Sequence, residues 1–138
     1  MKKKKIERTK RVIRESFLWW VKQMGFGWWR DVTAVYVERE KDYNKIRDGI
    51  EGGNAYVEVD WEYLQMTIWF NVERNARRKK REIENTVIHE LVHGLLAELV
   101  EYPDQKHEER VVVIIARAFQ WVRDEAEKLG IEKGGGNV

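Results

Sequence analysis

Two of the three histidines in this 138-residue chain, His89 and His93, stand four residues apart with a glutamate directly after the first. On a helix this spacing places both imidazoles on one face, one turn apart, with Cβ atoms about 5–6 Å from each other. Imidazoles placed in this way converge on one ion and supply half of a zinc site. Glu90 lies roughly 100° further round the helix, too far for a third ligand but near enough to reach a water on the metal. The pattern His-Glu-x-x-His therefore predicts a metal site in which Glu90 is a general base.

The residues around this motif favour a functional site over a solvated helix face that carries two ordinary histidines. The chain contains no cysteine, which excludes disulfide scaffolds, zinc-thiolate fingers and cysteine nucleophiles. A metal site must therefore use histidine and carboxylate. Large apolar residues surround the motif, at Val87, Ile88, Leu91 and Val92. They predict a largely buried helix, where unpaired imidazoles and carboxylates would be costly.

A catalytic zinc commonly has three protein ligands and an open position for water, so a third ligand is expected. The candidates follow the motif by 14 to 16 residues and are His107, Glu108 and Glu109. On the helix expected there, Glu109 shares a face with Val113 and Ala116, and such a face can look inward. Glu109 is therefore the first choice, Glu108 is a close alternative, and His107 ranks third.

A motif helix followed by a glutamate-bearing helix resembles the zincin metallopeptidases, and specifically small gluzincin-like domains of the phage-type or minimal kind. The resemblance covers roughly residues 65–120 and includes the Glu-Glu-Arg-Val-Val run at 108–112 and the alanine-rich turn at 116–119. In gluzincins the third ligand is a glutamate on the helix after the motif helix. The resemblance therefore implies Zn²⁺ as the cofactor. It implies as metal ligands His89, His93 and Glu109, with Glu108 as the alternative third ligand.

The resemblance also implies hydrolysis of peptide bonds in a peptide or protein substrate. Zinc would polarise the scissile carbonyl and lower the pKa of its water toward ~7, while Glu90 passes the proton to the leaving amine. The strand at residues 65–72 would be the sheet edge beside the metal, where an extended peptide can add as another strand. Gly94 would keep the helix surface open next to the metal. A tyrosine could stabilise the oxyanion, although packing is the more expected role for each candidate. The candidates are Tyr43, Tyr63 and Tyr102.

Hydrophobic periodicity predicts an α+β, zincin-like fold with an N-terminal helix, a small three-stranded, mainly antiparallel sheet, the motif helix and the glutamate-bearing helix. The predicted helices cover residues 6–24, 77–100 and 104–129. The predicted strands cover residues 32–39, 55–63 and 65–72, the last two joined by a turn at residues 62–64. Residues 41–54 indicate an irregular loop, and about residues 133–138 a disordered tail. The β-branched run at 111–115 lowers helix propensity and leaves a buried strand as the alternative there.

Composition and charge are typical of one soluble domain over residues 1–138. With 26 basic and 24 acidic residues the net charge is +2, so nucleic acid is a minor hypothesis as a partner. The basic runs at residues 2–5 and 77–81 are interpreted as solvated helix starts. The tryptophan pairs at 19–20 and 28–29 are expected to serve mostly in core packing. No apolar run approaches the ~18–20 residues that span a bilayer, and no signal-peptide pattern is present, so we expect a cytoplasmic protein without a membrane partner.

Two other functions compete with the zinc metallopeptidase. The first is a non-catalytic interaction module that keeps the zincin fold, because the chain is short for a second lobe that would form the far wall of a substrate cleft. The second is a nucleic-acid-binding protein that uses the basic runs, which predicts salt-dependent affinity. The sequence makes no prediction of the oligomeric state.

Overall fold

The computed structural model describes residues 2–46, 53–97 and 105–130, without the side chains of residues 105–108. The α-helices in this part of the chain are α1 (Lys3–Gln23), α2 (Glu40–Ile46), α3 (Val72–Asn75), α4 (Lys80–Leu96) and α5 (Gln105–Lys128). The strands are β1 (Asp31–Val37), β2 (Ala55–Asp60) and β3 (Gln65–Asn71), and one 3-10 turn, η1 (Phe26–Trp28), follows α1. The predicted α+β class is confirmed.

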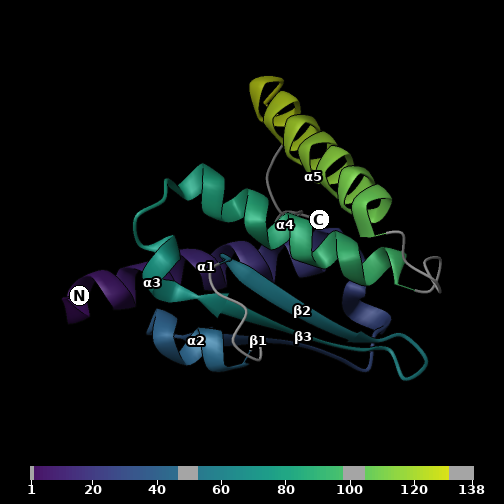
Figure 1. Ribbon diagram of the computed structural model, residues 1–138. Coiled ribbons are helices and arrows are strands. Elements are labelled where there is room, and N and C mark those ends of the chain that lie inside the picture. Colours follow the sequence, from purple (N-terminus) through teal and green to yellow (C-terminus); the bar gives the residue numbers. More distant parts are fainter. Residues whose placement is uncertain (1, 47–52, 98–104, 131–138) are drawn as a thin grey trace.

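Helices α1 and α4 pack side by side and cover one face of the sheet (Figure 1). Apolar residues of α1 recur at spacings of three and four and form a buried stripe of Ile13, Phe17 and Trp20. Phe17 meets the sheet at Phe70 of β3, where the two rings pack edge to face with centroids 6.3 Å apart. Gly25 then ends the helix with a left-handed φ of 78°. The core therefore lies between the sheet and the two helices.

The sheet has the order β1-β3-β2 and is mixed. β2 pairs antiparallel with β3 across a short turn, as predicted, but β1 pairs parallel with β3. The prediction of a mainly antiparallel sheet is therefore wrong, because alternation of apolar residues identifies a buried face but not the direction of the neighbouring strand. The prediction that residues 65–72 form the sheet edge is also wrong. β3 is the central strand, and β2 is the edge strand that packs beside α4.

The helices differ from the prediction at two places. The loop predicted at residues 41–54 begins inside α2. The sequence did not indicate this helix, because Tyr43 is its one buried residue and gives no amphipathic period. The motif helix α4 begins at Lys80, after the short helix α3, and its first turn is closed by a hydrogen bond from the Lys79 amide to Glu82. The end predicted near residue 100 lies outside the described residues, as does the predicted tail.

Helix α5 is continuous, so the strand alternative for residues 111–115 is wrong. It packs on α4 and rises away from the sheet, as Figure 1 shows. Its attachment to α4 therefore decides where the glutamates of its first turns lie. No helix within the described ranges is long and apolar enough to cross a membrane.

Candidate metal centre

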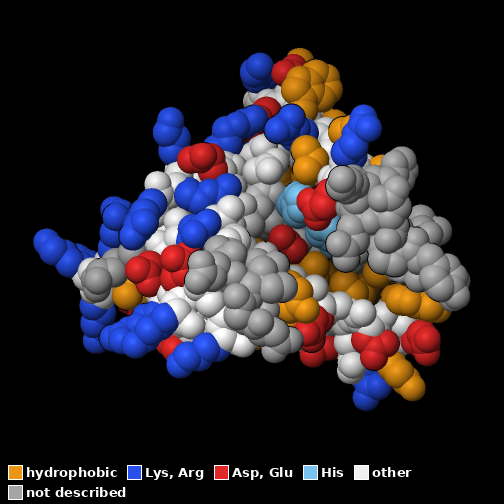
Figure 2. Space-filling view, in the orientation of Figure 1, with side chains coloured by type: hydrophobic (Ala, Val, Ile, Leu, Met, Phe, Trp, Pro, Cys, Tyr) orange, Lys and Arg blue, Asp and Glu red, His pale blue; other side chains and the backbone are white. Residues whose placement is uncertain are grey.

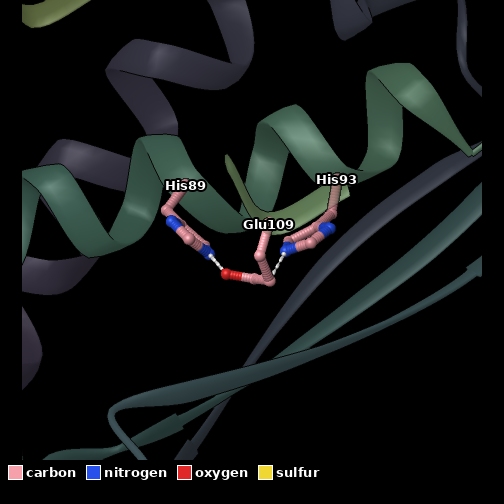
Figure 3. Close-up of side chains that lie close together, drawn as sticks. All are labelled: His89, His93 and Glu109. Carbon is pink, nitrogen blue, oxygen red and sulfur yellow. Dashed lines mark ion pairs between the residues drawn. The ribbon is translucent and has the colours of Figure 1, made fainter. Parts of the chain in front are cut away.

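Helices α4 and α5 bring together His89, His93 and Glu109 (Figure 3). The two imidazoles project from successive turns of α4, with ring centroids 5.0 Å apart. The Glu109 carboxylate lies between them, with Oε2 3.3 Å from Nε2 of His89 and Oε1 2.8 Å from Nε2 of His93. Three possible ligand atoms, one from each residue, thus lie within 4.8 Å of one another.

This cluster has donor types that occur in zinc sites, and its ligand atoms lie close enough together to share one ion. Imidazole nitrogen and carboxylate oxygen are common zinc ligands, and around a tetrahedral ion with bonds of ~2.0–2.1 Å two ligand atoms lie roughly 3.3 Å apart. The contact of Glu109 with Nε2 of His89, at 3.3 Å, matches this value, whereas its contact with Nε2 of His93, at 2.8 Å, is shorter. The three residues could therefore hold a metal ion, and three protein ligands are the number that leaves a position open for water.

Burial of His89 favours the neutral form of its imidazole. The side chains of His89 and His93 are 21% and 16% exposed, whereas that of Glu109 is 53% exposed. Burial lowers the pKa of His89, the negative charge of Glu109 opposes this shift, and the nearby His93 adds to it. Because a metal binds the neutral imidazole, burial favours binding at neutral pH. Figure 2 shows histidine side chains at the surface with an acidic side chain against them.

The core holds α4 in the orientation that presents the two histidines. Fully buried residues flank the motif, namely Val87, Ile88, Leu91 and Val92. Gly94 is buried as well, and a Cβ at this position would come within 2.6 Å of the Met66 sulfur. Gly94 therefore lets α4 approach β3 closely, and the prediction that it keeps the surface open next to the metal is wrong.

A partly buried ion pair, between Arg123 and Glu84, links α5 to α4. Arg123 of α5 donates two hydrogen bonds to the Glu84 carboxylate of α4, one of them from Nη1 at 2.5 Å. The indole of Trp20 and the amide of Gln120 donate to the same carboxylate at 3.1 and 3.0 Å. Burial raises the pKa of Glu84, but these hydrogen bonds outweigh burial and hold it below its usual value. Sequence reasoning did not identify this pair, because only the packing of the helices matches two charges 39 residues apart.

Glu90 is buried and lines a cavity of about 250 Å³. The same cavity is lined by Arg78, Asn85, Thr86 and His89, together with the chain that enters β2. A carboxylate and one of the metal-site imidazoles therefore face one space. The role of Glu90 as a general base stays a prediction.

The three tyrosines proposed as candidates for an oxyanion role differ in where they lie and in what the structure describes of them. Tyr43 is fully buried in α2, which packs against β1, β3 and α3. Tyr63 lies in the turn between β2 and β3 and is 61% exposed. Tyr102 lies outside the described residues, and so do the side chains of His107 and Glu108. The positions of Tyr43 and Tyr63 therefore assign neither of them to this role.

The tryptophans and the basic runs mostly behave as expected. Trp20 is buried, Trp19 and Trp29 pack against the core, and Trp28 is exposed.

Residues 2–5 are exposed, and basic side chains gather on the part of the surface that holds the N-terminal end of α1 (Figures 1 and 2). Within the run at 77–81 every residue is exposed except Arg78, which is half-buried. The interpretation of this run as a solvated helix start is therefore wrong for Arg78.

Comparison with known proteins gives no relative from which a function could be transferred. No protein-family model matches the chain, and no curated protein or solved structure is significantly similar to it.

Proposed function

We propose that this protein is a zinc-dependent peptidase of the zincin type, with His89, His93 and Glu109 as the metal ligands. The observation that carries the proposal is the convergence of two imidazole nitrogens and one carboxylate oxygen within 4.8 Å, contributed by two different helices. A single ion pair would need one imidazole beside Glu109, whereas two imidazoles lie beside it here. The buried carboxylate of Glu90, in a cavity that His89 also lines, adds the proton acceptor that hydrolysis needs.

The chemistry divides between the ion and the chain. When bound, zinc supplies a Lewis acid that polarises the scissile carbonyl and lowers the pKa of water toward ~7. Glu90 takes a proton from the attacking water and delivers it to the leaving amine, so that it acts first as a base and then as an acid. Burial around Glu90 and His89 limits competing water and strengthens the electrostatic interactions at the reacting bond.

Strand β2 offers the substrate a place to bind. It is an edge strand, it pairs with β3 on one side, and it packs beside the helix that carries the histidines. An extended peptide can add to such an edge through main-chain hydrogen bonds, which give affinity with little dependence on side chains. This assignment replaces residues 65–72, which lie in the centre of the sheet.

The test compares cleavage by the wild-type protein and by Glu90→Gln, both loaded with zinc, on a library of unfolded peptides followed by mass spectrometry. Glutamine keeps the size of the side chain but cannot accept the proton. We expect cleavage by the wild type and a loss of at least about a hundredfold in Glu90→Gln, with equal zinc content in both proteins.

Three other outcomes would count against the proposal or part of it. No cleavage by a zinc-loaded wild type would favour a non-catalytic module that keeps the metal. Equal cleavage by both proteins would remove Glu90 from the mechanism. Binding of DNA or RNA at low salt, lost as salt rises, would instead favour the nucleic-acid alternative.

A further inference from the structure

Arg78 is the one member of the basic run at 77–81 that turns inward. Its Nη1 donates hydrogen bonds to Oδ1 of Asn75 at 2.9 Å and to Oγ1 of Thr86 at 2.6 Å. Asn75 is itself fully buried and donates to the carbonyl oxygens of Asn54 and Asn71. The guanidinium is thus held in one orientation between α3 and α4.

The positive charge of Arg78 has no carboxylate within ion-pair distance among the described residues. Both acceptors at Nη1 are neutral oxygens, and the nearby Glu82 uses one of its oxygens to accept from the Lys79 amide. Burial lowers the pKa of Arg78, an effect that Glu82 partly opposes. A guanidinium has five N–H donors, and the described residues accept from only one of its nitrogens, Nη1. Among these residues, the edge formed by Nε and Nη2 is left for an anion.

Arg78 lines the same cavity as Glu90 and His89. Thr86, which fixes its guanidinium, precedes Glu90 by four residues on α4, about 6 Å along the helix axis. The volume of about 250 Å³ is below the ~300–1,000 Å³ of sites that enclose whole drug-sized ligands. The space therefore fits one side chain or one chain end of a substrate that extends beyond it.

We propose that Arg78 forms a carboxylate-binding subsite next to Glu90, so that the preferred substrates are peptides that carry a carboxylate close to the scissile bond. The carboxylate belongs either to an acidic side chain or to a free C-terminus. Arginine matches a carboxylate through two parallel hydrogen bonds, which add orientation to affinity. As a statement about substrate class this proposal rests on the proposed peptidase function, but the binding step itself requires no hydrolysis.

Arg78 and Glu90 line the same cavity. A substrate whose carboxylate is held by Arg78 therefore places the neighbouring part of its backbone in the space that Glu90 also lines.

The experiment measures binding, so its result does not depend on turnover. Fluorescently labelled peptides are titrated with Glu90→Gln protein, supplied with one equivalent of zinc, and followed by anisotropy. The two peptides of the first pair both have an amidated C-terminus and differ at the central residue, which is Glu in one and Gln in the other. The two peptides of the second pair both have the central Gln and differ at the C-terminus, which is free in one and amidated in the other. We expect the carboxylate member of at least one pair to bind about tenfold more tightly, the size of one charged hydrogen-bond pair.

Arg78→Gln and Arg77→Gln are then introduced separately into the same protein. Both remove one positive charge, but Arg77 is exposed and Arg78 lines the cavity. We expect the preference to disappear with Arg78→Gln and to persist with Arg77→Gln. Thermal unfolding checks that each variant folds, and Arg78→Lys, which keeps the charge without the planar fork, retains part of the preference.

Three results would overturn the subsite. They are no preference for the carboxylate peptide in either pair, equal losses from Arg77→Gln and Arg78→Gln, and no measurable binding of any carboxylate peptide. The first and third need no Arg78 variant, so they apply even if Arg78→Gln does not fold. If carboxylate peptides bind through Arg78 but the wild type cleaves no peptide, the subsite is supported and the peptidase function is rejected.

Discussion

At the scale of single residues, the three candidate ligands differ in how firmly the fold holds them. His89 and His93 lie on a helix whose neighbouring residues are fully buried, so their positions follow from the packing of α4. Glu109 lies near the start of α5, and its side chain is 53% exposed. The histidines are therefore preorganised by the core, whereas the carboxylate depends on where α5 sits.

The choice of third ligand is tested by Glu109→Gln against Glu108→Gln. The Glu109 carboxylate contacts both imidazoles. Replacing residues that merely support a metal ligand typically costs 10–100-fold in affinity. We therefore expect Glu109→Gln to weaken zinc binding by more than about a hundredfold, while Glu108→Gln stays near the wild type. Competition with a chromophoric chelator measures both affinities, and the opposite ranking would make Glu108 the ligand.

Protonation of His89 predicts a pH dependence of stability in the metal-free protein. Burial lowers the pKa of His89 in the folded chain, so the unfolded chain takes up this proton at higher pH. The free energy of unfolding therefore falls as the pH drops below about 6.5 toward the lowered pKa of the folded state. We expect urea unfolding to show a smaller loss of stability between about pH 7.5 and pH 5 in His89→Gln than in the wild type. Equal losses of stability in the two proteins would mean that folding does not shift the pKa of His89.

At the scale of elements, the connection between α4 and α5 assembles the site. The Glu84–Arg123 pair lies on the two helices that carry the ligands, and both of its side chains are largely buried. The exposed pair Arg81–Asp124 joins the same two helices. These two pairs provide a matched comparison of a buried and an exposed link.

Glu84→Gln is expected to destabilise the protein by about 2 kcal/mol, the scale of hydrogen bonds to a charged group. It should also weaken zinc binding, because the substitution weakens the attachment of α5 to α4, and α5 carries Glu109. Arg81→Gln should cost less than about 1 kcal/mol, as exposed pairs do, and should leave zinc affinity unchanged. Chemical denaturation and zinc titration give the two values for each variant, and an equal effect of both substitutions would contradict the role assigned to Glu84.

The sequence predicted the helices and strands that contain the site, but not how they are arranged. Spacing of apolar residues was sufficient for α1, α4 and α5 because each buries one face. The parallel pairing of β1 with β3 and the central position of β3 depend on contacts between distant segments, which a local pattern does not contain. The histidine pair was predictable because both residues lie on one helix. The Glu84–Arg123 pair and the inward turn of Arg78 required the packed structure.

At the scale of the whole molecule, the net charge is only +2, but the face shown in Figure 2 does not carry its charges evenly. Basic side chains gather on one part of the surface, and the histidines lie at another part of the same view (Figure 2). A metal bound by α4 and α5 would join the helix that packs on the sheet to the helix that rises from it. Metal binding should therefore affect the stability of the molecule as a whole.

Zinc is expected to raise the stability of the folded protein by mass action. At a free concentration one hundred times its dissociation constant, a ligand that binds only the folded state adds about 2.7 kcal/mol. Thermal unfolding with and without zinc should show an upward shift of the midpoint for the wild type and for Glu90→Gln, which keeps all three ligands. His93→Ala should show no shift, and a full shift in that variant would place the metal elsewhere.

The zinc content of purified protein tests the central claim most directly. Metal analysis of the wild type, His89→Ala, His93→Ala and, as a control, His107→Ala is made after dialysis against the same zinc buffer. The metal centre proposed here predicts one zinc per chain in the wild type and in His107→Ala, and almost none in His89→Ala and His93→Ala. Zinc retained in full by His89→Ala or His93→Ala would contradict it.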